Sequence, residues 1–222
     1  MILPFDAVLF DCDGVLADSE TLTHEVLCSM LAELGWQLSV PEAMKLFMGR
    51  ALRDDMALIE QHVGPLPAGW MASFVERRNL ALTERVKPIA NIEAAVKHLH
   101  AQYAGHIACA SGADRAKVEM MLHKIGLIPY FEGRVFSGHE MPRSKPFPDV
   151  YLAAAAALGV APTRCAVIED TVTGVQAGVA AGATVYAYVP PTSIYQGGDV
   201  LRQAGAAVEF SDMAELAELL GA

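Results

Sequence analysis

The stretch AVLFDCDGVLADSE (residues 7–20) decides the fold of this chain of 222 residues. Its first four residues are apolar, which is typical of a strand that is buried on both faces of a parallel sheet. Asp11 and Asp13 follow at once, and Gly14 permits a sharp turn that would bring both carboxylates to one place. Open α/β sheets bind ligands at the carboxyl ends of their strands, so we expect a site here. Taken alone, the segment also fits a helix N-cap or a surface turn.

Three further segments carry polar residues at the ends of apolar runs or in a loop. HIACA precedes Ser111 and Gly112, RCAVI precedes Glu169 and Asp170, and Lys145 lies in the proline-rich segment SKPFPD. Each has an ordinary structural interpretation as well. Ser111 is a candidate helix N-cap that competes with Asp114, the two acids stabilise a helix N-terminus, and a lone lysine is usually solvated. The order of acid pair, hydroxyl, lysine and second acid pair is the specific signal.

Hydrophobic periodicity divides the chain into two kinds of structure. Residues 18–85 show helical spacing without a strand signal, with helices expected at residues 19–34, 41–47, 51–63 and 70–86. Later strands are expected at residues 106–110, 134–136, 165–168, 184–189 and 207–210. Later helices are expected at residues 91–104, 113–125, 148–158, 172–181 and 213–220. The pattern predicts an α/β fold, a Rossmann-like doubly wound parallel sheet (residues 1–17 and 86–222) with an inserted all-helical domain (residues 18–85).

The composition of the chain limits the classes of partner and the kinds of site that we expect. The formal net charge of -10 argues against nucleic acid, which is bound through clustered lysine and arginine. The chain has neither a basic leader nor a run of 18 apolar residues, so we expect a cytoplasmic protein without a membrane span, a monomer or weak homodimer. Its seven histidines lack zinc-site spacing. The cysteines show no paired spacing and are expected to be reduced: Cys12, Cys28, Cys109 and Cys165.

With all four segments present, the chain resembles the haloacid dehalogenase-like hydrolases, in particular the β-phosphoglucomutase-like phosphatases with an inserted helical cap. The resemblance implies that Asp11 is a nucleophile that forms an aspartyl-phosphate and that Asp13 is the general acid and base. It also implies a Mg²⁺ cofactor, for which Asp11, the backbone carbonyl of Asp13, Glu169 and Asp170 would supply oxygen ligands.

The resemblance also assigns the phosphoryl-binding groups. Ser111, together with the neighbouring backbone at Gly112, would bind the transferring phosphoryl group, and Lys145 would neutralise its oxygens. The cap loop that contains Met48 and Arg50 would contact the rest of the substrate.

We therefore expect a Mg²⁺-dependent phosphatase acting on a small phosphorylated metabolite, a sugar or polyol phosphate. The alternative is a phosphosugar mutase on the same scaffold. The mutase pattern has a histidine where this chain has Thr23 and a lysine where it has Met48, which favours the phosphatase. More remote is a metal-binding, receiver-type regulatory domain, for which an enclosing cap has no use. A haloacid dehalogenase would need neither Asp13 nor a metal.

Overall fold

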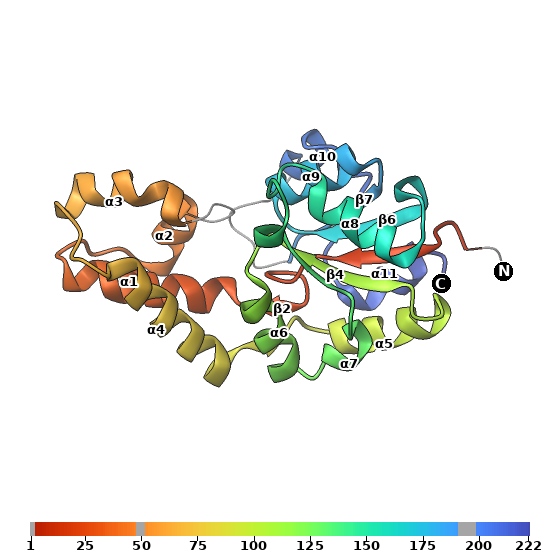
Figure 1. The fold of residues 1–222 in the computed structure, drawn as a ribbon, viewed down its shortest axis with the longest axis horizontal. Helices are drawn as coiled ribbons and strands as arrows, with labels where there is room; N and C mark the ends of the chain where they lie inside the picture. Colours follow the sequence, from red (N-terminus) through yellow and green to blue (C-terminus); the bar gives the residue numbers. More distant parts are fainter. Residues whose placement is uncertain (1–2, 48–51, 191–198) are drawn as a thin grey trace. The chain divides into compact units, whose positions relative to one another are not determined.

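The computed structural model describes residues 3–47, 52–190 and 199–222 (Figure 1). The chain forms two compact units. The larger unit contains Met1–Ala17 and Lys87–Ala222, and the smaller unit contains Asp18–Val86.

A six-stranded parallel sheet forms the centre of the larger unit (Figure 1). In spatial order its strands are β5 (Val135–Ser137), β4 (Ile107–Ser111), β1 (Ala7–Phe10), β6 (Cys165–Glu169), β7 (Thr184–Tyr188) and β8 (Val208–Phe210). Numbered along the chain, these strands run 3-2-1-4-5-6, which is the order of a doubly wound Rossmann-type sheet. The fold class predicted from the sequence is thus confirmed. The strand order reverses between β1 and β6, and ligands of such sheets bind at that switch point.

The register of the strands determines which side chains lie next to one another at the carboxyl ends of β1, β4 and β6. Phe10, the last residue of β1, pairs with Cys109 of β4 on one side and with Ile168 of β6 on the other. The residues that follow Phe10 and Ile168 are therefore neighbours across the switch point, and Ser111 of β4 ends close by. The three central strands are buried along their whole length, which makes their carboxyl ends a rigid support for polar side chains.

Helices cover both faces of the sheet, as a doubly wound fold requires. One face carries α8 (Asp149–Leu158), α9 (Val172–Ala181) and α10 (Val200–Gln203) (Figure 1). The other carries α5 (Ile92–Gln102), α6 (Arg115–Lys124), α7 (Ile128–Phe131) and α11 (Leu216–Leu219). Small side chains such as Ala154 and Ala155 let α8 pack closely on Leu9 and Val167 of the sheet.

The smaller unit contains α1 (Glu20–Glu33), α2 (Val40–Phe47), α3 (Met56–Val63) and α4 (Trp70–Arg85). They enclose their own apolar cluster, centred on Leu31, Ile59 and Phe74. The sequence pattern predicts one helix over residues 51–63, and this is wrong in part. A 3₁₀ turn, Leu52–Asp55, precedes α3, and Asp55 occupies the N-cap position of that helix.

Several short elements escape the sequence pattern. β2 (Ala17–Asp18) and β3 (Lys87–Pro88) pair as a two-stranded sheet where the chain passes from one unit to the other and back. The helices α7 and α10 have four residues each, too few for a hydrophobic period to show. Among the residues that the structure describes, none of the helices has the length and apolar character needed to cross a membrane.

Candidate active site

The chain turns sharply after β1. The N–H of Gly14 donates to the carbonyl of Ala17 at 2.9 Å, and Gly14 has a φ of 75°, which an L-residue adopts only with strain. Asp11 is buried at the start of this turn, and Asp13 lies within it. Burial raises the pKa of Asp11, and the negative charges of Glu169 and Asp13 add to that rise. The turn expected from the DxDG sequence is present.

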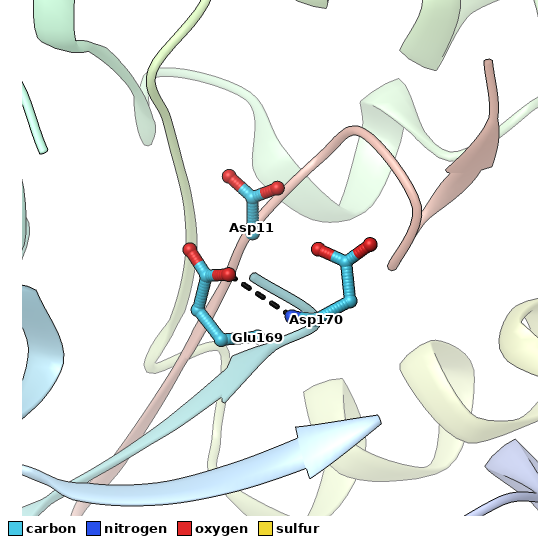
Figure 2. A group of neighbouring side chains, drawn as sticks. All are labelled: Asp11, Glu169 and Asp170. Atoms are coloured by element: carbon cyan, nitrogen blue, oxygen red, sulfur yellow. Dashed lines mark hydrogen bonds between the residues drawn. The ribbon is translucent and has the colours of Figure 1, made fainter. Parts of the chain in front are cut away.

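Three buried carboxylates meet at the switch point of the sheet (Figure 2). Asp11 follows β1, Glu169 ends β6, and Asp170 is the next residue. Each offers one oxygen, and these three oxygens lie within 4.8 Å of one another. The register of β1 and β6 brings them together although they are far apart in the sequence.

Lys145 lies among these acids. Its Nζ is 2.6 Å from Oδ1 of Asp11 and 2.6 Å from Oε1 of Glu169. Burial raises the pKa of Asp11 to about 7; the ammonium of Lys145 opposes that rise, and the charges of Glu169 and Asp13 add to it. Burial would lower the pKa of Lys145, but the two carboxylates outweigh it and hold that pKa well above its usual value. Lys145 therefore keeps its charge in this site.

Glu169 is held by many donors. Its Oε1 also accepts from the hydroxyl of Tyr151 at 2.8 Å, and its Oε2 accepts from the N–H of Asp170 at 3.0 Å and from the N–H and hydroxyl of Thr171, each at 3.1 Å. Burial alone would raise the pKa of Glu169, but Lys145, Tyr151 and Thr171 bring it below its usual value. With Lys145, these groups give the carboxylate of Glu169 five donors, and a carboxylate has about four acceptor sites, so the side chain is fixed in place.

Ser111 does not cap the helix that follows it. The cap of α6 is Asp114, whose Oδ1 accepts from the N–H of Lys117 at 2.9 Å. The hydroxyl oxygen of Ser111 accepts from the N–H of Ala113 at 3.1 Å, and Ser111 is buried at the end of β4 beside β1. The alternative in which Ser111 is only an N-cap is therefore wrong. At Gly112 an added Cβ would lie 3.9 Å from Oγ of Ser144, which is ordinary contact.

The acidic cluster fits a hard divalent cation. The donors that gather here are carboxylate oxygens, which Mg²⁺ prefers, and no histidine or cysteine belongs to the three-residue cluster among the described residues. Burial is the main cause of the raised pKa of Asp11, and the negative charges of Glu169 and Asp13 add to it. A divalent cation would favour the ionised carboxylates.

Sequence reasoning missed two buried residues of this region. Tyr151 of α8 donates to Glu169, and Lys145 Nζ lies 4.8 Å from the centre of its ring. Lys117 of α6 places its Nζ 2.7 Å from Oδ1 of Asp13. The period of a helix predicts burial for Tyr151 but not its partner, and Lys117 looks like an ordinary surface lysine in the sequence.

Met48 and Arg50, also predicted for the site, lie outside the described residues.

Gly14→Ala is expected to disturb the acidic cluster. A Cβ at Gly14 would lie 2.0 Å from Oδ2 of Asp170, and the positive φ adds strain of about 1–3 kcal/mol. Gly126→Ala is a matched control, because Gly126 also has a φ of 75° but has nothing within 4 Å of its added Cβ. We expect urea unfolding to show a loss of stability in both variants. Titration calorimetry should show weakened Mg²⁺ binding only in Gly14→Ala; equal Mg²⁺ binding by the two variants would contradict the placement of Asp170.

Known proteins show the same architecture. The family model described as haloacid dehalogenase-like hydrolase matches residues 5–182. A 6-phosphogluconate phosphatase of Escherichia coli is 32% identical over 82% of this chain and 81% of its own, and a fructose-1-phosphate phosphatase of Escherichia coli is 30% identical over 80% and 93%. A solved HAD family hydrolase from Deinococcus radiodurans, with bound phosphate and sodium, is 37% identical, covers 98% of this chain and 96% of its own, and has a TM-score of 0.83.

Proposed function

Since this chain belongs to the haloacid dehalogenase-like hydrolases, we propose that it is a Mg²⁺-dependent phosphatase that works through an aspartyl-phosphate on Asp11. One observation carries the proposal. The ammonium of Lys145 lies 2.6 Å from Asp11, beside Glu169 and Asp170, at the switch point where such a sheet binds its ligand. A buried nucleophilic carboxylate, a fixed cation and a cation-binding set of acids are what phosphoryl transfer to a carboxylate needs.

The first step transfers the phosphoryl group to the protein. A carboxylate oxygen of Asp11 attacks phosphorus, the bond from phosphorus to the ester oxygen breaks, and the leaving oxygen takes a proton from Asp13. In the second step, water attacks the aspartyl-phosphate, gives its proton to Asp13, and releases phosphate with the Asp11 carboxylate restored. Positioned proton transfer of this kind contributes roughly 10²–10⁴-fold to the rate.

The remaining groups bind charge. Lys145 neutralises the phosphoryl oxygens and holds Asp11 in place, while Ser111 and the backbone at Gly112 bind the same group from the end of β4. Asp11, Asp170, Glu169 and the backbone carbonyl of Asp13 would hold Mg²⁺, with Glu169 the most constrained of them because it already accepts several hydrogen bonds. When bound, the metal screens the acids from the dianionic substrate.

The proposed substrates are sugar or polyol phosphates. The two Escherichia coli relatives act, by their names, on 6-phosphogluconate and fructose 1-phosphate. A mutase is less well supported, because Thr23 stands in place of the mutase histidine. The neighbouring His24 is buried, with Nδ1 2.8 Å from the carbonyl oxygen of Glu20 in its own helix.

A panel of phosphorylated sugars, sugar acids and polyols tests this function, with phosphate release measured with and without Mg²⁺. We expect Mg²⁺-dependent release from at least one class of sugar or polyol phosphate. Folded protein that releases no phosphate from any ester in the panel would contradict the proposal. Conversion of glucose 1-phosphate to glucose 6-phosphate faster than phosphate release would favour the mutase.

A further inference from the structure

Lys117 is a buried lysine that faces the active site from α6. Its side chain is 9% exposed, and its Nζ lies 2.7 Å from Oδ1 of Asp13, more than a hundred residues away in the sequence. Asp114 caps the helix by accepting from the N–H of Lys117, so the backbone of Lys117 is fixed in the first turn. The contact therefore joins two rigid points, the start of α6 and the turn after β1.

Burial of the charged side chain of Lys117 at this position has a cost in free energy. Removing an ammonium group from water is unfavourable unless a nearby carboxylate offsets the lost hydration. A cation in the first turn of a helix is also disfavoured by the helix dipole. Both costs favour keeping the carboxyl group of Asp13 within hydrogen-bond distance of Lys117.

The ion pair fixes the orientation of a side chain whose backbone is already fixed. The turn holds the main chain at Asp13 through its bridge to Ala17 and through the Gly14 hydrogen bond. The side chain of an aspartate in such a turn still has two torsions. Anchoring Oδ1 to Lys117 restrains both torsions and so determines where Oδ2 lies.

Orientation of Asp13 matters most in the second chemical step. A leaving group is covalently attached to phosphorus, but the attacking water is placed only by its hydrogen bonds. A base that is misplaced by a small distance therefore loses much of its effect on that water.

We propose that Lys117 is a positioning residue of the reaction, which holds the Asp13 carboxylate in the orientation that receives the proton of the attacking water. The inference rests on the proposed phosphatase function. In this step the oxygen of water bonds to phosphorus, the bond from phosphorus to Asp11 breaks, and the proton goes to Asp13. Lys117 neither gains nor loses a proton.

The test uses p-nitrophenyl phosphate, whose leaving group needs no proton, so that kcat/KM reports formation of the phosphoenzyme and kcat reports its hydrolysis. For Lys117→Met we expect kcat to fall about 10–100-fold while kcat/KM stays within about threefold. A pre-steady-state burst of p-nitrophenolate should appear. Lys117→Arg should recover most of the loss, and Lys124→Met, at an exposed lysine of the same helix, should match the wild type.

A double-mutant cycle separates this role from a structural one. If Lys117 acts through Asp13, Lys117→Met should add no further loss to Asp13→Asn. Additive losses, an equal fall of kcat and kcat/KM, or no change in either would overturn the inference. If Lys117→Met does not fold, Lys117→Gln is judged by the same criteria. Wild-type protein that hydrolyses no phosphate ester would overturn the proposed function and this inference together, whereas an active wild type with unaffected Lys117 variants would overturn the inference alone.

Discussion

Asp11→Asn is expected to lower phosphate release by at least about 10³-fold, because an amide cannot form the acyl phosphate. The substitution keeps the volume of the side chain, and Lys145 retains Glu169 as a partner at 2.6 Å. Circular dichroism and thermal unfolding should therefore show a folded protein. Steady-state phosphate release on the best substrate of the panel measures the effect.

Asp6→Asn is the matched control for this variant. Asp6 lies before the other end of β1, half-exposed, and pairs with Arg164 at 2.7 Å. A surface ion pair of this kind contributes about 0–1 kcal/mol, so the control should keep wild-type turnover. If Asp11→Asn retains more than a few per cent of the wild-type rate in protein free of contaminating phosphatase, the covalent mechanism has to be abandoned.

Removal of the metal is expected to have the second large effect. Excess chelator should lower turnover by at least about 100-fold, because the acidic cluster would then repel a phosphate dianion and Asp11 would lose the cation that favours its ionised form. Added Mg²⁺ should restore activity. Ca²⁺ should inhibit, since its larger and looser coordination shell would misalign the nucleophile and phosphorus.

Asp170→Asn gives this prediction a readout besides activity. The variant should bind Mg²⁺ more weakly in titration calorimetry, because one of the three clustered carboxylates loses its charge. Glu209→Gln, a substitution on the edge strand β8, should bind Mg²⁺ as the wild type does. Full activity in excess chelator, or unchanged Mg²⁺ affinity of Asp170→Asn, would contradict the metal assignment.

The sequence predicts those parts of the site that short motifs place directly. Asp11 follows an apolar run at a DxDG turn, and Glu169 follows another, so parallel pairing brings both to one edge of the sheet. The alternation of strands and helices likewise predicts a doubly wound parallel sheet. Each of these motifs is a local signal in the sequence. Pairing of the strands in the sheet then brings the motifs close together in space.

Contacts between side chains of distant elements could not be predicted in this way. Nothing in the sequence distinguishes Lys117 from a solvated helical lysine, because its partner Asp13 lies on another element. The hydroxyl of Tyr151 likewise finds Glu169 only after α8 packs on the sheet. The choice between Ser111 and Asp114 as the cap of α6 depends on the backbone geometry at these residues, which the two residue types alone do not determine.

The site of phosphorylation tests the central claim most directly. Asp13→Asn protein should form the phosphoenzyme from p-nitrophenyl phosphate and Mg²⁺ but hydrolyse it slowly, so acid quenching and peptide mass spectrometry can locate the phosphoryl group. The account predicts one hydroxylamine-sensitive phosphoryl group, on Asp11. A phosphoryl group on another residue, or no phosphoenzyme at any time point while the wild-type protein releases phosphate, would contradict it.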